Sequence, residues 1–136
     1  MASLRSALVV ARPSPLRDGL AALLGSMPLL SAVHQADSLA SALRTVTLHQ
    51  PTLILVDADL PGGEAWALLR QVKRRWPQTW CVVMTDTIRS IQQAEDAGAN
   101  QVLLKGYPAA KLSRVLEQLL GSETHVGVSG KSPVSL

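Results

Sequence analysis

The sequence predicts an α/β fold in which five strand–helix repeats build a doubly wound, five-stranded parallel sheet. Short apolar runs alternate with segments whose apolar residues recur at helical spacing, and this alternation is typical of βαβ units. The apolar runs are also continuous, as expected for strands that helices cover on both faces. The 136 residues are enough for one hydrophobic core and too few for a second full domain.

The first two repeats lie between residues 7 and 51. Residues 7–10 are the first expected strand, and Gly25 is expected to end the following helix in a left-handed conformation. Residues 29–33 are the second expected strand, and Asp37 or Ser38 is expected as the N-cap of a helix that stops at residues 50–51, Gln-Pro. The apolar faces of these two helices are expected to carry Leu16, Leu20, Leu23, Leu24, Leu39, Ala42, Leu43 and Val46.

The third repeat contains the clearest central strand. Residues 52–56, Thr-Leu-Ile-Leu-Val, are apolar and rich in β-branched side chains, and they lead directly into Asp57. Residues 61–63, Pro-Gly-Gly, then form a turn. The next helix is expected to end before Trp76, because a residue ahead of a proline disfavours helical dihedral angles. Its expected buried residues are Trp66, Leu69 and Val72.

The last two repeats run from residue 80 to residue 121. Residues 80–84 and 101–104 are the expected fourth and fifth strands, and Gly98 is expected to stop the helix between them. The final helix is expected to begin near Pro108. The apolar positions expected on the two helices are Ile88, Ile91, Ala94, Leu112, Val115, Leu116 and Leu119. Residues 1–121 are therefore one expected domain, and residues 122–136 are expected to be a flexible tail or the start of a linker.

Charge and composition argue against several classes of protein. The net charge is +3, but the basic residues are spread along the chain, so we expect no direct nucleic-acid binding by this chain alone. The nearest cluster, residues 70–75, is more typical of a solvated helix face. A single cysteine, Cys81, fits a reducing compartment. No leader peptide opens the chain and no apolar run approaches the ~20 residues of a membrane span, so we expect a cytoplasmic protein without membrane contact.

Ligand chemistry in an open parallel sheet collects where the strands end. Residues 55–62, Leu-Val-Asp-Ala-Asp-Leu-Pro-Gly, place Asp57 at one strand end, followed in order by Thr85 and by Lys105 within Leu-Leu-Lys. In this ordered set the chain resembles a response-regulator receiver domain. Residues 16–20, Leu-Arg-Asp-Gly-Leu, are similar to the first helix of the LuxR/NarL-type subgroup, and the resemblance covers roughly residues 5 to 120.

The resemblance implies a flavodoxin-like strand order, 2-1-3-4-5, and a role in two-component phosphorelay signalling. Asp57 would be the phosphoacceptor, Lys105 would pair with a phosphoryl oxygen, and the Thr85 hydroxyl would close on another oxygen. The partner would be a sensor histidine kinase or another signalling protein. A homodimer would use the fourth helix and fifth strand, the face that relatives commonly use.

The chain departs from the family pattern at two places, the acidic residues that hold a metal ion and the aromatic residue that acts as a conformational switch. The two acidic residues that hold a divalent cation in the family correspond to Ala11 and Arg12, so we expect weak or absent Mg²⁺ binding and no other cofactor. Arg12 is expected either to replace the metal by an internal ion pair with Asp57 or to be a solvated loop residue. Val102 stands where the family carries a switching Tyr or Phe, and it has no ring to move.

Three functions remain open from the sequence. The first is an atypical receiver that acts as an interaction or dimerisation module, without enzyme activity and without normal Mg²⁺-dependent phosphorylation. The second is a conventional receiver in which a histidine kinase phosphorylates Asp57. The third, more distant, is an aspartate-nucleophile phosphohydrolase, since Asp57-Ala58-Asp59 fits a DxD motif although only Glu117 and Glu123 follow Lys105. The simpler alternatives are an Asp57 that only pairs with Lys105 and a Thr85 that only caps a helix.

Overall fold

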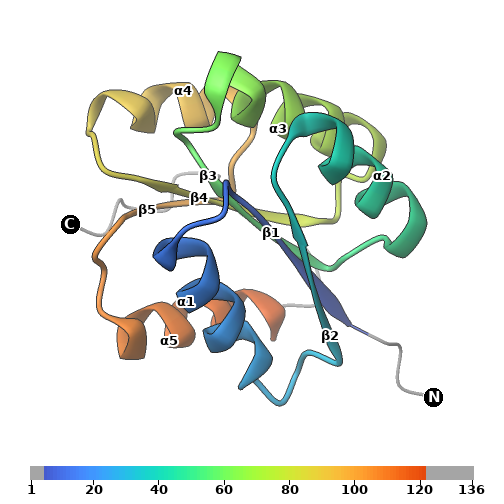
Figure 1. Ribbon diagram of the computed structural model, residues 1–136, viewed down its shortest axis with the longest axis vertical. Coiled ribbons are helices and arrows are strands. Elements are labelled where there is room, and N and C mark those ends of the chain that lie inside the picture. The colour runs from blue at the N-terminus through green and yellow to red at the C-terminus, as the bar shows by residue number, and fades with distance from the viewer. Residues whose placement is uncertain (1–4, 122–136) are drawn as a thin grey trace.

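The computed structural model describes residues 5–121, in which five strands and five α-helices alternate along the chain (Figure 1). The strands are β1 (Ser6–Val10), β2 (Ala32–Ala36), β3 (Leu53–Asp57), β4 (Trp80–Thr85) and β5 (Gln101–Leu104). The helices are α1 (Pro15–Gly25), α2 (Leu39–His49), α3 (Glu64–Arg75), α4 (Arg89–Ala97) and α5 (Ala109–Leu120), and a 3₁₀ turn, η1 (Pro61–Gly63), precedes α3. All four strand pairs are parallel, and the order β2-β1-β3-β4-β5 confirms the predicted fold class.

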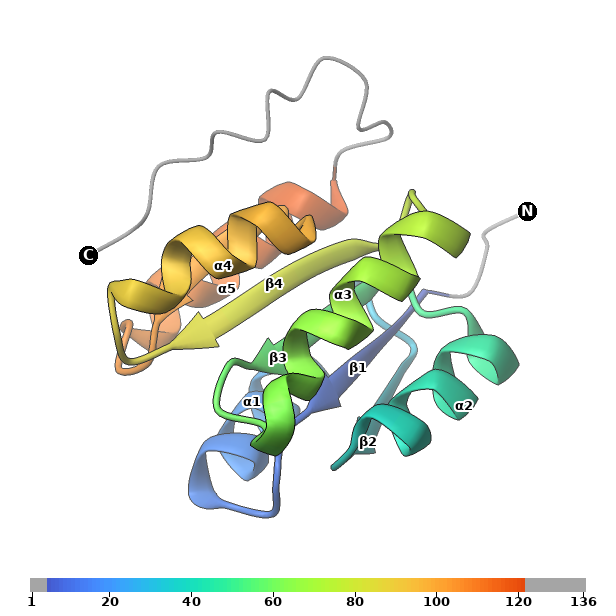
Figure 2. The same ribbon diagram turned by 90° about the horizontal axis from the view of Figure 1, so that it is seen from above.

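Helices cover both faces of the sheet (Figures 1 and 2). α2, α3 and α4 lie on one face, and α1 and α5 lie on the other. Side chains of the central strand alternate between the two cores: Ile54 and Val56 pack under α2 and α3, while Leu53 and Leu55 pack against the α1 and α5 side. Because both faces of the strand are buried, its sequence is continuously apolar, which explains why the pattern predicted this layering.

Several predicted helix ends are confirmed. Ser38, and not Asp37, is the N-cap of α2, and its hydroxyl accepts a hydrogen bond of 3.1 Å from the Ser41 amide. α3 ends at Arg75, ahead of Trp76 and its following proline. α4 ends at Gly98, which has the left-handed φ of 105° that favours glycine.

Three predicted details are wrong. The second strand is Ala32–Ala36 and not residues 29–33, because a turn in which the Leu30 amide donates to the Met27 carbonyl follows α1 and delays the strand. Gly25 is the last residue of α1 and has no positive φ, since the helix ends at Ser26 in a right-handed conformation. Ile88 precedes α4 and is 69% exposed, so it does not belong to the buried face of that helix.

Within residues 5–121, no helix is long and apolar enough to cross a membrane. The predicted tail or linker, residues 122–136, lies outside the described residues. The described residues, 5–121, cover the predicted receiver-like segment, residues 1–121, except its first four residues.

Candidate functional site

The strand register brings the sequence-predicted site residues to one edge of the sheet. β1 and β3 pair Val10 with Val56, which places Ala11 beside Asp57. On the other side of β3, the Lys105 amide donates to the Thr85 carbonyl at 2.7 Å and so continues the pairing of β4 with β5. The carboxyl ends of β1, β3, β4 and β5 therefore meet at this edge, where parallel sheets carry their ligand chemistry.

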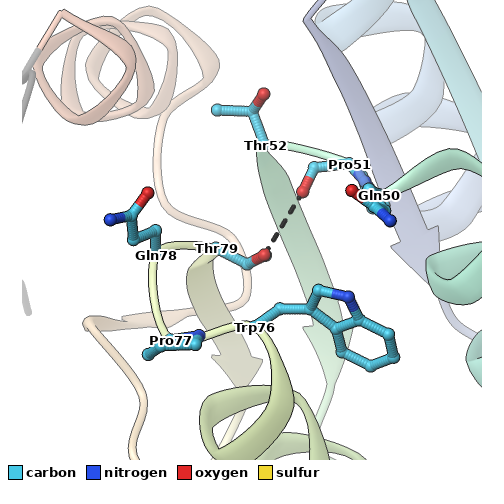
Figure 3. Close-up of a pocket in the computed structure, with 7 residues that line it drawn as sticks. All are labelled: Gln50, Pro51, Thr52, Trp76, Pro77, Gln78 and Thr79. Carbon is cyan, nitrogen blue, oxygen red and sulfur yellow. Dashed lines mark hydrogen bonds between the residues drawn. The ribbon is translucent and has the colours of Figure 1, made fainter.

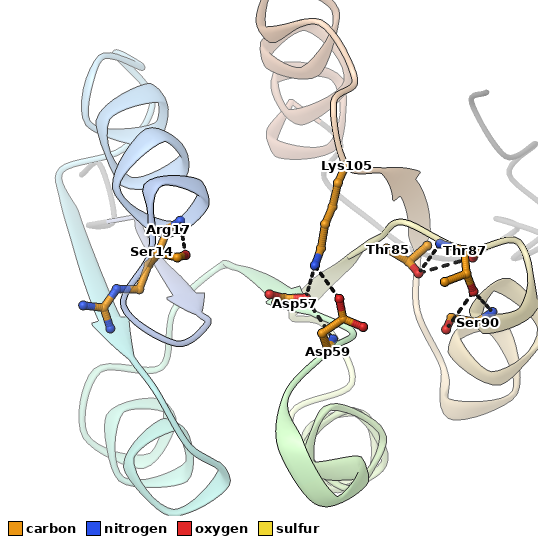
Figure 4. Close-up of polar contacts among 8 residues, drawn as sticks. All are labelled: Ser14, Arg17, Asp57, Asp59, Thr85, Thr87, Ser90 and Lys105. Atoms are coloured by element: carbon orange, nitrogen blue, oxygen red, sulfur yellow. Dashed lines mark hydrogen bonds and ion pairs between the residues drawn. The ribbon is translucent and has the colours of Figure 1, made fainter.

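One ammonium group bridges two carboxylates at this edge (Figure 4). Lys105 Nζ lies 2.8 Å from Asp57 Oδ1 and 2.8 Å from Asp59 Oδ2. The Asp59 amide also donates to Asp57 Oδ1 at 2.8 Å, which holds the turn after β3 against the Asp57 carboxylate. The Asp57 side chain is 15% exposed and that of Asp59 is 56% exposed, so Asp57 is partly enclosed while Asp59 forms the outer side of the site.

The charge of Lys105 is stabilised by this arrangement. Partial burial by itself acts to lower the pKa of Lys105, but its hydrogen bonds and Coulombic attraction to Asp57 and Asp59 outweigh burial and raise the pKa above 10.5. Lys105 therefore remains a cation throughout the neutral range. It gives the two carboxylates an internal counter-ion.

The end of β1 contributes no carboxylate. Ala11 is buried, and Arg12 is exposed without an ion pair in the part of the chain that the structure describes. The predicted ion pair between Arg12 and Asp57 is therefore not present, and Lys105 neutralises Asp57 instead. A second arginine, Arg17 of α1, donates from Nη1 to the Ala11 carbonyl at 3.3 Å, and its guanidinium lies on the side away from Asp57 (Figure 4). The sequence pattern does not predict this contact, because Arg17 lies on a helix that could present it to solvent.

The Thr85 hydroxyl is turned away from Asp57. Thr85 is fully buried, and its Oγ1 donates to the Thr87 carbonyl at 3.3 Å and accepts from the Thr87 amide at 3.2 Å (Figure 4). Thr87 in turn accepts a hydrogen bond of 3.2 Å from the Ser90 amide at the start of α4. Thr87, rather than Thr85, therefore contacts the first turn of this helix, whose N-cap is Ile88. The structure does not bring the Thr85 hydroxyl to the pair formed by Asp57 and Lys105.

Val102 lies inside the core and not at the edge of the sheet. It pairs in register with Val83 and packs in the apolar cluster that contains Ala94 and Ala97 of α4. The neighbouring aromatic residue, Tyr107, packs against the cluster on the opposite face of the sheet. At the position of Val102 there is consequently no ring that could exchange between core and solvent.

The donors at this edge do not fit the divalent cation that the family resemblance implies. Among residues 5–121 there is no group of three or more His, Cys, Asp or Glu side chains that could hold a metal ion. Asp57 and Asp59 are the carboxylates at the site, and both already contact the Lys105 ammonium. A cation such as Mg²⁺ takes several oxygen ligands at short distances, so it would compete with Lys105 for the same oxygens.

Comparison with protein families identifies the class of this domain. The family model of the response regulator receiver domain matches residues 8–117, which is most of the chain. The DNA-binding transcriptional activator DevR/DosR of Mycobacterium tuberculosis is 30% identical over 105 residues, covering 76% of this chain and 48% of that protein. The transcriptional activator protein ExaE of Pseudomonas putida is 29% identical over 113 residues, covering 82% of this chain and 53% of that protein. The chain thus spans about half the length of the curated relatives it matches.

Solved structures show the same fold. A LuxR-family two-component response regulator from Aurantimonas aligns with a TM-score of 0.77 at 22% identity, covering 87% of this chain and 86% of that chain. The strand order, the position of Asp57 at the end of β3 and the match over residues 8–117 agree with one another. The chain belongs to the response regulator receiver domain family.

Proposed function

We propose that this chain is an atypical receiver domain in which the Lys105 ammonium, rather than a divalent cation, neutralises the carboxylates of the phosphoacceptor site. The observation that carries the proposal is the pair of 2.8 Å contacts from Lys105 to Asp57 and Asp59, at a sheet edge where Ala11 and Arg12 provide no acid. Normal Mg²⁺-dependent phosphorylation of Asp57 is accordingly weakened. The domain then acts mainly as a protein-interaction or dimerisation module in phosphorelay signalling, without catalysing a reaction of its own.

Electrostatics supports this proposal. Two carboxylates with one ammonium carry a net charge of −1, whereas a receiver with two further acids would carry −3 at the same place and attract a divalent cation strongly. Unit charges about 4 Å apart interact by roughly 4 kcal/mol at the effective dielectric constant of a protein surface. The loss of two acids therefore weakens the attraction for a divalent cation by more than a single hydrogen bond or packing contact contributes. Transfer of a phosphoryl group to Asp57 would then lack the cation that spreads its developing charge.

The proposed partner is a sensor histidine kinase or another signalling protein, and the proposed dimer face is formed by α4 and β5. Family membership supports the kinase, since receiver domains act in two-component signalling. The names of the relatives, both transcriptional activators, support a place in regulators of transcription. We place any contact with DNA outside this chain.

A conventional phosphoaccepting receiver is the second candidate. It is favoured by the Asp57 carboxylate, which ends the central strand, is partly exposed and contacts Lys105, the cation that would pair with a phosphoryl oxygen. A phosphohydrolase has less support. The second carboxylate of the DxD motif, Asp59, is held by Lys105, and Glu117 is on α5, on the other face of the sheet from η1 and α3.

Phosphorylation chemistry separates the two candidates directly. The protein is incubated with acetyl phosphate, or with beryllofluoride, in the presence and absence of Mg²⁺, and its intact mass and amide NMR spectrum are recorded. We expect little change for the wild-type protein, and Asp57→Asn serves as the variant without a phosphoacceptor. An Mg²⁺-dependent mass gain in the wild type that Asp57→Asn abolishes would contradict the proposal and establish the conventional receiver.

A gain-of-function variant tests the proposed reason for weak Mg²⁺-dependent phosphorylation of Asp57. Ala11→Asp combined with Arg12→Asp adds two acids at the end of β1, beside Asp57 in the strand register. We expect this variant to bind Mg²⁺ more tightly than the wild type and to be modified at Asp57 more rapidly. If titration detects no increase in Mg²⁺ affinity, the missing acids at positions 11 and 12 are not the reason for weak Mg²⁺ binding.

A further inference from the structure

The charges on α2 and α3 are unevenly distributed. α3 carries Glu64 at its first position and four cations in its second half, and α2 adds Arg44. Glu64 is engaged at the start of α2, where its Oε1 accepts a 2.7 Å hydrogen bond from the Leu39 amide. Lys73 is engaged inside the fold, where its Nζ donates to the Thr79 carbonyl at 2.8 Å and to Asn100 Oδ1 at 2.9 Å. The cations that remain exposed are Arg44, Arg70, Arg74 and Arg75, and we call them the arginine surface.

Within residues 5–121, the arginine surface forms no ion pair with an acidic side chain. Both ion pairs found in residues 5–121 belong to Lys105, at the carboxyl edge of the sheet. Arg75 contacts the ring of Trp76, with its guanidinium carbon 4.5 Å from the ring centroid. Other helices carry a more even mixture of charges: α5 contains two cations, Lys111 and Arg114, and one acid, Glu117, and α4 contains one cation and two acids. The charge on the arginine surface is therefore available to a partner.

A cavity lies at the end of α3 (Figure 3), and its Trp76 ring contacts Arg75 of the arginine surface. Its volume is about 470 Å³, and it is lined by Gln50, Pro51, Thr52, Trp76, Pro77, Gln78 and Thr79. The Thr79 hydroxyl donates to the Pro51 carbonyl at 3.4 Å and joins the two loops that form the cavity. The lining combines an indole and two proline rings with uncharged amides, so the cavity suits an apolar or amide-bearing side chain and not a phosphate group.

This surface differs from both regions that the proposed function uses. The cavity lies where β3 and β4 begin, whereas Asp57 lies where β3 ends, and a strand of five residues spans about 17 Å. α2 and α3 lie side by side on one face of the sheet (Figures 1 and 2). The proposed dimer face on α4 and β5 lies beyond α3, on the side of β5, which is the outer strand opposite to β2. A partner on the arginine surface could therefore bind whether or not Asp57 is phosphorylated.

We propose that the arginine surface and its adjoining cavity bind an acidic segment of a partner protein, which places an apolar side chain against Trp76. Guanidinium groups bind carboxylates through paired hydrogen bonds. Arg70 and Arg74 are four residues apart on one helix, about 6 Å between neighbouring side chains, which matches two carboxylates one helical turn apart. Tryptophan and arginine are also the residues that dominate binding energy at protein interfaces.

A protein partner fits these features better than nucleic acid does. The cavity beside the cations is lined by uncharged residues, and Leu48, two residues before Gln50, is 76% exposed. A phosphate backbone gains from cations alone and leaves such apolar surface in water. A protein segment that carries both carboxylates and an apolar side chain uses both parts of the surface.

Binding of a defined probe tests the proposal. The probe is a fluorescein-labelled helical peptide built from Glu and Leu, and a peptide with Gln in place of each Glu is its control. Arg70→Glu combined with Arg74→Glu reverses two exposed cations, and the matched control, Lys111→Glu combined with Arg114→Glu on α5, makes the same change in net charge. We expect the α3 variant to bind the Glu peptide at least about tenfold more weakly, and the α5 variant within about twofold of the wild type.

Two further measurements locate and classify the binding. Amide chemical shifts of the ¹⁵N-labelled protein should change on α2, α3 and the loops around Trp76 when the Glu peptide is added. The peptide should also bind more tightly than a duplex DNA of equal charge. Equal weakening in both variants, shifts centred on α4 and β5, tighter binding to DNA, or no binding of the Glu peptide would each overturn the proposal. Circular dichroism verifies that both variants are folded.

Discussion

Lys105 Nζ lies 2.8 Å from Asp59 Oδ2, across 46 positions of sequence. The contact places the ammonium between Asp59 and Asp57, so the site contains one cation and two acids. The sequence pattern predicts a different arrangement, in which one aspartate, Asp57, faces two cations, Arg12 and Lys105. The difference arises because the turn after β3 directs Asp59 to Lys105, while Arg12 extends into solvent.

Removal of the Lys105 ammonium should create affinity for a divalent cation. Lys105→Met leaves Asp57 and Asp59 side by side without a counter-ion, which is the arrangement that hard divalent ions neutralise. We expect Mn²⁺ to raise the melting temperature of this variant by several degrees and that of the wild type by much less; a stabilisation of about 1 kcal/mol shifts Tm by roughly 4 °C in a domain of this size. Lys111→Met on α5 is the control. Equal shifts in all three proteins would contradict the counter-ion role.

Lys73 should contribute to stability through its buried hydrogen bonds. Burial lowers the pKa of Lys73, and its Nζ contacts the Thr79 carbonyl and Asn100 Oδ1, which links α3 to the loops before β4 and β5. Lys73→Met removes these donors and takes away the ammonium partner of the buried Thr79 carbonyl, while Asn100 Oδ1 keeps its 2.8 Å hydrogen bond from the Cys81 amide. We therefore expect a loss of about 1–3 kcal/mol of unfolding free energy in urea titrations. Lys111→Met should lose less than about 0.5 kcal/mol.

Gly98 should be coupled to Lys73. A Cβ on Gly98 would lie 2.8 Å from Lys73 Cγ, and its φ of 105° strains any other residue. Gly98→Ala should therefore cost about 1–3 kcal/mol of unfolding free energy. In combination with Lys73→Ala the two losses should not be additive, because the shortened side chain removes the clash. Additive losses in a double-mutant cycle would show that φ strain alone sets the cost.

Cys81 should be unreactive in the folded protein. The thiol is fully buried, and burial raises its pKa to about 12, against a smaller opposing effect of Lys73. We expect no reaction with a disulfide reagent at neutral pH under native conditions and complete reaction in denaturant. Rapid native labelling, monitored by absorbance, would show that the β4 region opens more readily than its burial indicates.

The stacked imidazoles of His34 and His49 should make stability depend on pH. Their ring centroids are 4.0 Å apart, and burial, followed by repulsion from His49, lowers the pKa of His34 below 6.5. The unfolded chain therefore binds this proton at a higher pH than the folded protein does, so stability is lost as the pH falls through 6.5 and levels off below the folded pKa.

Variants of the pair isolate this effect. His34→Gln should flatten the dependence of unfolding free energy on pH between about 7.5 and 5, and His49→Gln should reduce it by removing the repulsion. The pKa of His34 is read directly from NMR titration of its ring protons. A His34 pKa that does not rise in His49→Gln would contradict the electrostatic coupling.

The sequence alone was sufficient for the architecture and for most strand positions. Ile54 and Val56 face one core, and Leu53 and Leu55 face the other. A strand that is apolar on both faces is buried on both faces, which in a parallel sheet requires a layer of helices on each side. Asp57 and Lys105 were placed at one edge of the sheet for a topological reason, since parallel strands end together. The edge strand β2 was misplaced, because only Ala36 of this strand is buried and its apolar pattern is weak, whereas the other edge strand, β5, has two buried residues.

Only the tertiary structure decided how side chains meet at the ends of these elements. The contacts of Lys105 with Asp59 and of His34 with His49 join different elements of the fold. The Thr85 hydroxyl is held to Thr87 by two local hydrogen bonds. Periodicity reports which face of an element is buried, which settles layers and strand ends. It carries no information on which polar side chains at those ends are partners, because that depends on turn geometry and strand register together.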